Sequence, residues 1–172
     1  MDFFRYLFLI LILSGSTSIG FLISKRYKER VKELNAISRL INILQNKIKF
    51  THMPLGEILE EISDIKTNPR ISDLFYKVSQ KLKTKSTQDS WDESIEEEKF
   101  YLNLKNEDIN LIKSLGNTLG KTDTEGQMSG IHQFNTLLQI QIKEAEQERL
   151  KNEKMYKSLG TIVGLAIVIL LF

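Results

Sequence analysis

The string Gly116–Thr122 (GNTLGKT) is the part of the chain that most resembles a catalytic motif. A P-loop reads GxxxxGK[ST], and it needs a strand before it and a helix directly after it, so that backbone amides converge on phosphate. This string has one residue fewer between its glycines, and an amphipathic helix is predicted before it. We therefore interpret it as a helix-turn-helix corner, where Gly116 and Gly120 allow close packing and reversal of the chain. The alternative is a membrane-bound signalling or nucleotide-binding protein that uses this corner.

No other residues are spaced for catalysis or for binding a metal or cofactor. His52 and His132 have no second ligand at metal spacing, and HExxH does not occur. The chain has no cysteine, which excludes disulfides, thiolate catalysis and cysteine-ligated metals. Glu60 and Glu61 are adjacent, so on a helix they point to different faces and cannot act as an acid/base pair. We expect no cofactor and no enzymatic activity.

Two apolar segments lie at the ends of the chain. Phe3–Ile23 has the length that a membrane-spanning helix needs, and Leu159–Phe172 contains no charged residue. The second segment spans about 21 Å as a helix, short of the roughly 30 Å hydrocarbon core. Snorkelling of Lys157, local thinning of the bilayer or packing against another helix can meet this deficit. We expect both segments to be transmembrane helices, the second continuous with a long polar helix before it.

Small residues in the two apolar segments are spaced to let helices approach closely. Ser16 and Gly20 form a small-xxx-small pair in the first segment, and Gly160 and Gly164 form a GxxxG pair in the second. We therefore expect the two terminal helices to pack against each other through these four residues.

Basic residues flank the middle of the chain on both sides. They are Lys25, Arg26, Lys28, Arg30, Lys32, Arg149, Lys151, Lys154 and Lys157. Since basic residues stay on the cytoplasmic side of a membrane, we expect a transmembrane helix over 1–24, a cytoplasmic helical domain over 25–158 and a second transmembrane helix over 159–172. The alternative for the first segment is a signal peptide with Arg5 before its apolar core. The net charge of +2 gives no indication of nucleic acid as a partner, and the basic clusters suit anionic lipid head groups.

Between the apolar segments, apolar residues recur at helical spacing in six stretches, with no convincing strand. The fold class is therefore predicted as all-α, an antiparallel six-helix bundle between two transmembrane helices. The aromatic residues, Trp91 among them, sit at helical spacing and are expected in the core.

Turn and capping residues place the ends of these helices. Pro54 ends the first helix and begins the second, which carries Leu55 on its apolar face, and Asn68 caps the third. Thr84–Asp89 is predicted as a loop, and Ser90 with Glu93 as a capping box that opens the fourth helix. At the later corner, Gly120 closes the fifth helix and Asp123 caps the last.

Two helix faces carry charge of one sign. The third predicted helix has a lysine face over Lys77–Lys85, and the fourth is acidic over Asp92–Glu98. Both faces are candidates for contacts with a partner protein, and the alternative is that they are solvated surfaces.

Several of these strings recur together, in the same order, in one protein family. They are Gly20–Phe21, Lys25–Arg30, Thr51–Leu55, Trp91, Leu115–Gly120 followed by Asp123 and Gln127, Lys151–Met155, and Lys157–Gly160. The set resembles the stage III sporulation protein AB family of endospore-forming bacteria, over the length from the first apolar segment to the last residue.

The resemblance implies a structural role without catalytic residues. It implies a non-enzymatic component of the channel complex between mother cell and forespore, which is needed for late forespore gene expression after engulfment. It also implies a helical domain similar to the platform proteins of type II secretion and type IV pili. The expected partners are other proteins of the channel complex, with an ATPase component as one candidate, and the lipid bilayer. The expected location is the mother-cell membrane around the forespore.

Overall fold

The computed structural model describes residues 2–51, 53–120 and 123–171, and these residues form helices joined by short turns. The helices are α1 (Asp2–Phe50), α2 (Leu55–Ser63), α3 (Pro69–Lys81), α4 (Thr87–Glu98), α5 (Asn106–Thr118) and α6 (Thr124–Leu171). The described part of the chain contains no strand, which confirms the all-α prediction of six helices. His52, Lys121 and Thr122 lie outside the described residues, as does the side chain of Arg5.

The chain divides into two compact units. Unit 1 is Met1–Val31 with Glu144–Phe172, and unit 2 is Lys32–Lys143. The long helices α1 and α6 contribute to both units. The membrane boundaries expected after residue 24 and before residue 159 fall inside these helices, and they stay predictions.

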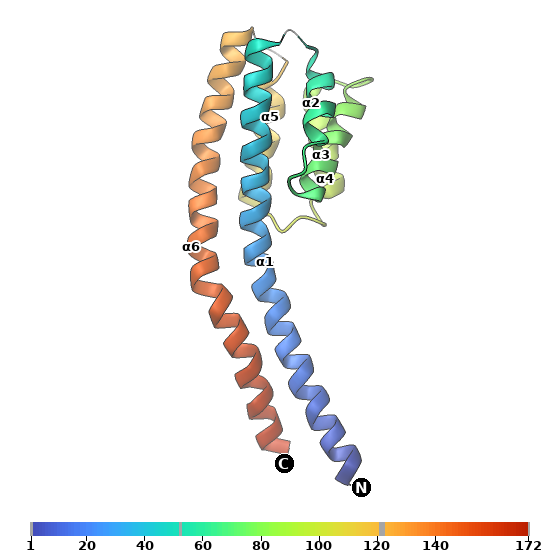
Figure 1. Cartoon of the computed structure of the whole chain (residues 1–172), viewed down its shortest axis with the longest axis vertical. Coiled ribbons are helices and arrows are strands. Elements are labelled where there is room, and N and C mark those ends of the chain that lie inside the picture. The colour runs from blue at the N-terminus through green and yellow to red at the C-terminus, as the bar shows by residue number, and fades with distance from the viewer. Residues whose placement is uncertain (1, 52, 121–122, 172) are drawn as a thin grey trace. The chain divides into compact units, whose positions relative to one another are not determined.

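Unit 2 is a helical bundle with one apolar core. The second half of α1 and the first half of α6 lie side by side in it, and α2 to α5 pack beside them (Figure 1). The apolar stripe of each helix is buried, because each helix can hide that stripe only against the others. The most buried side chains include Leu34, Ile37, Leu44, Leu59, Ile62, Phe75, Val78, Trp91, Ile95, Ile112, Ile131 and Leu138.

The start of α4 differs from the prediction. Ser86, not Ser90, is the N-cap, and its Oγ accepts a hydrogen bond from the Asp89 amide at 3.2 Å. Ser90 is buried inside the helix, so the predicted loop over Thr84–Asp89 is shorter than expected. Ser86 and Asp89 carry the same capping spacing as Ser90 and Glu93. The earlier start adds about one turn of helix.

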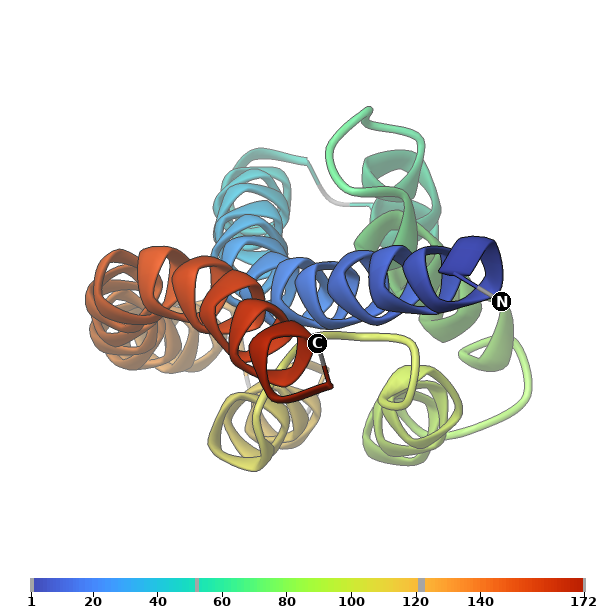
Figure 2. The same cartoon turned by 90° about the horizontal axis from the view of Figure 1, so that it is seen from below.

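Unit 1 consists of the terminal stretches of α1 and α6. These stretches lie side by side in both views (Figures 1 and 2). By length and composition, both helices are long and apolar enough to cross a membrane.

Candidate functional site

Within unit 1, the terminal helices come into backbone contact at two glycines. A Cβ at Gly20 would lie 2.6 Å from the carbonyl oxygen of Tyr156 and 3.0 Å from the Cα of Gly160. A Cβ at Gly160 would lie 2.9 Å from the carbonyl oxygen of Ser16. Because these neighbours are backbone atoms, no side-chain rotation can make room. The close approach therefore requires glycine at both positions.

The remaining small residues extend the same contact. The Oγ of Ser16 donates a hydrogen bond of 2.6 Å to the carbonyl oxygen of Gly160. A Cβ at Gly164 would lie 3.0 Å from the side chain of Leu13 and 3.2 Å from the Cβ of Ser16. Gly15 faces open space instead, with nothing within 4 Å of a Cβ placed there. The structure thus brings together the four residues that the sequence singled out, and leaves a neighbouring glycine outside the contact.

A polar contact continues this pairing at the end of unit 1 that carries the basic residues. The rings of Tyr27 and Tyr156 stack with centroids 5.8 Å apart. Arg30, only 4% exposed, pairs with Glu148 through Nη1 and Oε2 at 2.8 Å. Burial, followed by the hydrogen bond with Tyr156, raises the pKa of Tyr27. In the sequence Arg30 stands out only as part of a basic cluster, because nothing local to it indicates a partner 118 residues away.

In unit 2, Trp91 packs in the core beside Gly116. Trp91 is fully buried, its Nε1 donates to the carbonyl oxygen of Ile112 at 2.6 Å, and its ring meets Phe75 edge-on at 5.5 Å. A Cβ at Gly116 would lie 2.8 Å from the Cβ of Trp91. Gly116 therefore gives α4 and α5 the space to approach each other.

The corner after α5 is built on a left-handed glycine. Gly120 has φ +76°, a conformation that glycine adopts without steric cost. The side chain of Leu55, which follows Pro54 at the start of α2, lies 3.9 Å from a Cβ placed at Gly120. Asp123 caps the next helix, α6, since its Oδ1 accepts a hydrogen bond of 3.0 Å from the Gly126 amide.

The described part of this corner, Gly116 to Gly120, lacks the geometry of a phosphate-binding loop. Gly116 to Thr118 belong to α5, and a helix precedes the string where a P-loop has a strand. Their backbone amides are inside a helix, so they are not available to converge on a phosphate. Across 2–51, 53–120 and 123–171, no cluster of three His, Asp or Glu residues could hold a metal ion, and His132 is exposed.

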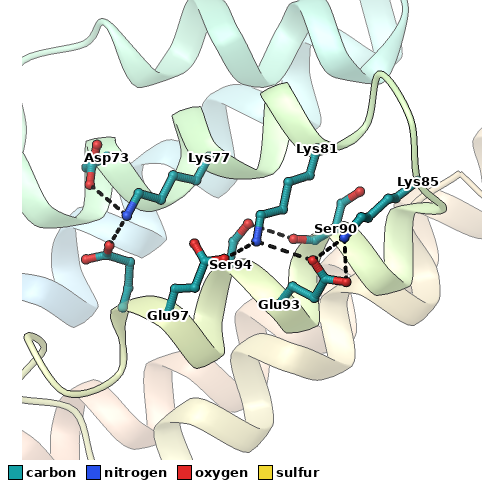
Figure 3. Close-up of polar contacts among 9 residues, drawn as sticks. Asp73, Lys77, Lys81, Lys85, Ser90, Glu93, Ser94 and Glu97 are labelled. Carbon is teal, nitrogen blue, oxygen red and sulfur yellow. Dashed lines mark hydrogen bonds and ion pairs between the residues drawn. The ribbon is translucent and has the colours of Figure 1, made fainter.

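The charged faces of α3 and α4 pair with each other. The Nζ of Lys81 lies 2.6 Å from Oε1 of Glu97 (Figure 3). The Nζ of Lys85, just after α3, lies 2.5 Å from Oε2 of Glu93. Lys77 pairs with Glu98 at one end of the same row. Three lysines and three carboxylates of the two faces that the sequence offered as partner contacts thus pair with each other within the chain.

Glu96 points toward α5 and forms a separate cluster. The Nζ of Lys113 in α5 lies 2.5 Å from Oε1 of Glu96, and the Nζ of Lys99 pairs with Oε2 of Glu96. These hydrogen bonds lower the pKa of Glu96 to about 2, so the carboxylate stays ionised and paired near neutral pH. The acidic face of α4 is therefore divided between two neighbouring helices of its own chain.

Comparison with known proteins decides the family. The family model described as stage III sporulation protein AB matches residues 5–172. The chain belongs to the stage III sporulation protein AB family. The resemblance inferred from the sequence motifs is therefore confirmed.

Two members of the stage III sporulation protein AB family show how far the similarity extends. The protein of that name from Bacillus subtilis (strain 168) is 32% identical over 164 residues, covering 94% of this chain and 95% of the relative. A solved structure named stage III sporulation protein AB (SpoIIIAB) is similar with a TM-score of 0.67 at 26% identity. It covers 72% of this chain and 98% of its own. These findings link the chain to sporulation.

Proposed function

We propose that the chain is a non-enzymatic membrane component of the sporulation channel complex between mother cell and forespore. It acts there as a scaffold or docking platform that late forespore gene expression requires. The observation that carries this proposal is the glycine-mediated pairing of the two terminal helices within unit 1. Such a pair anchors a domain without supplying any catalytic group.

The outer surface of unit 1 is apolar and is suited to a lipid environment. Large apolar side chains point away from the helix pair, and their exposed fractions include 63% for Phe8, 64% for Ile10, 74% for Ile169 and 85% for Leu170. Monomeric soluble proteins rarely expose so much contiguous apolar surface to water. The basic residues that flank the middle of the chain support a cytoplasmic location for unit 2. Membership of the sporulation family supports the mother-cell membrane around the forespore as the membrane concerned.

The surface of α6 in unit 2 is suited to a protein partner. Residues 126–142 contain no Asp, Glu, Lys or Arg, although 27% of the chain is charged. On this stretch Leu137 is 44% exposed and Ile140 is 51% exposed. Depletion of charge with exposed apolar side chains is typical of the centre of protein interfaces. We assign this neutral face of α6 to another protein of the channel complex, an ATPase component being one candidate.

Leu137→Glu combined with Ile140→Glu tests this assignment. Because both side chains are largely exposed, we expect the stability of the domain to change by no more than about 0.5 kcal/mol per site. Heat-resistant spore counts in a host lacking its own copy should nevertheless fall by orders of magnitude, because an uncharged interface must then bury two carboxylates. A photoreactive residue at position 137 should also cross-link to a protein of the complex in sporulating cells.

The matched control is Asn110→Glu, a charge added at an exposed, uncharged position of α5. It should leave both spore counts and unfolding unchanged. Normal sporulation of the Leu137→Glu, Ile140→Glu variant would contradict the docking role of this face.

A further inference from the structure

The loop between α4 and α5 exposes two adjacent aromatic side chains. It covers residues 99–105 (KFYLNLK), and in it Phe100 is 84% exposed and Tyr101 is 65% exposed. Aromatic side chains dominate cores and interfaces because their burial is strongly favourable. Two of them side by side in solvent therefore indicate a surface that something else covers.

The rest of the loop is firmly attached to unit 2. The Asn103 backbone N–H and its side-chain amide donate to the two carboxylate oxygens of Glu33, at 2.7 and 2.8 Å. Arg70 donates to the carbonyl oxygen of Tyr101, and Leu102 is buried. These contacts hold the loop in place, so the exposed aromatic pair is displayed by the fold.

The hydrogen bonds between Asn103 and Glu33 also locate the loop at one end of unit 2. Glu33 follows Lys32, where α1 enters unit 2 from its apolar segment. Ile23, the last residue of that segment, is ten residues earlier in the sequence. The loop thus belongs to the end of unit 2 through which the chain arrives from the proposed membrane segment.

The charge of the loop suits an anionic surface. Residues 99–105 include Lys99 and Lys105 and no acidic residue. Glu96, which pairs with Lys99, is shared with Lys113, so one carboxylate balances two ammonium groups. Aromatic side chains next to lysines are the combination found where proteins contact the lipid head groups of a membrane. Anionic lipids attract such lysines by about 1 kcal/mol each.

We propose that this loop is a membrane-contact site, with Phe100 and Tyr101 seated among the head groups of an anionic lipid surface and the lysines beside them. Unit 2 then has an attachment to the bilayer of its own, in addition to α1 and α6. This inference rests on the proposed membrane anchoring of the chain. It assigns to a lipid surface the role that a protein partner would otherwise take at this loop.

Quenching of tryptophan by brominated lipids tests the proposal on the full chain in vesicles containing anionic lipid. Phe100→Trp keeps an aromatic ring in the loop, and the native Trp91 supplies a small constant background because it is fully buried. The matched control is Phe50→Trp, because the native Phe50 is 73% exposed at the end of α1 in unit 2. Ile10→Trp, in the apolar segment, reports on the membrane anchor itself.

We expect bromine near the head groups to quench Phe100→Trp several-fold more than Phe50→Trp, relative to the parent chain. Adding Lys99→Gln and Lys105→Gln should reduce that quenching, as should replacing the anionic lipid with a zwitterionic one. Equal quenching at positions 100 and 50, with strong quenching at position 10, overturns the loop contact and leaves the membrane anchor standing. Absence of quenching at position 10 overturns the anchor, and the loop contact falls with it.

Discussion

Trp91→Ala should destabilise the helical domain by roughly 3–5 kcal/mol, the usual cost of truncating a large buried aromatic side chain. The ring is fully buried and meets Phe75 edge-on, so its removal leaves a cavity where three helices meet. It also leaves the carbonyl oxygen of Ile112 without the hydrogen bond that the indole donates at 2.6 Å. Since natural domains are stable by only about 5–15 kcal/mol, this single change removes a large part of the total.

Denaturant unfolding of the full chain in detergent, followed by circular dichroism, measures the effect. Tyr76→Ala is the matched control, because Tyr76 is an aromatic residue of α3 that is 46% exposed. Its unfolding midpoint should stay near that of the parent. A Trp91→Ala midpoint as high as the Tyr76→Ala midpoint would show that α4 and α5 do not depend on this contact.

Gly20→Leu should separate the two terminal helices and abolish sporulation. The Cβ alone would lie 2.6 Å from the carbonyl oxygen of Tyr156, and the rest of the leucine side chain has no space between the two backbones. Overpacking of a close contact costs about 1–3 kcal/mol even where side chains can adjust. Here the obstacles are backbone atoms, so we expect the helices to move apart.

Gly15→Leu is the matched control, since a Cβ at Gly15 meets nothing within 4 Å. The chain has no cysteine, so nitroxide labels at Ile10→Cys and Ile169→Cys report one defined distance in vesicles. That distance should lengthen and broaden in Gly20→Leu and stay unchanged in Gly15→Leu, and spore counts should follow the same order. An unchanged distance in Gly20→Leu would contradict the pairing.

Local patterns in the sequence were sufficient to predict most of the fold. Apolar spacing identified the six helices, and proline, asparagine and glycine identified most of their ends. The N-cap of α4 was ambiguous, because Ser86 and Ser90 are each followed three residues later by an acidic residue. Only the packing of α4 decides between the two serines. Small-residue spacing singled out Ser16, Gly20, Gly160 and Gly164, but spacing alone does not give the distances at which they meet.

Contacts between distant parts of the chain could not be predicted. The lysines of α3 and the carboxylates of α4 were visible as faces, but their mutual pairing depends on how the two helices pack. The same holds for Arg30 with Glu148 and for Glu33 with Asn103, which are 118 and 70 residues apart. Periodicity reports which face of a helix is buried and does not report its neighbour.

We propose above all that paired terminal helices anchor the chain in a membrane and leave the helical unit in the cytoplasm. Labelling of single cysteines by a membrane-impermeant maleimide, in protoplasts of an endospore-forming host, tests it most directly. Thr84 is exposed in the turn between α3 and α4, and Asp2 precedes the apolar segment Phe3–Ile23, so Thr84→Cys and Asp2→Cys are the two labelling sites. We expect intact protoplasts to label at position 2, and position 84 to label only after the membrane is opened. Labelling at position 84 in intact protoplasts would contradict this proposal.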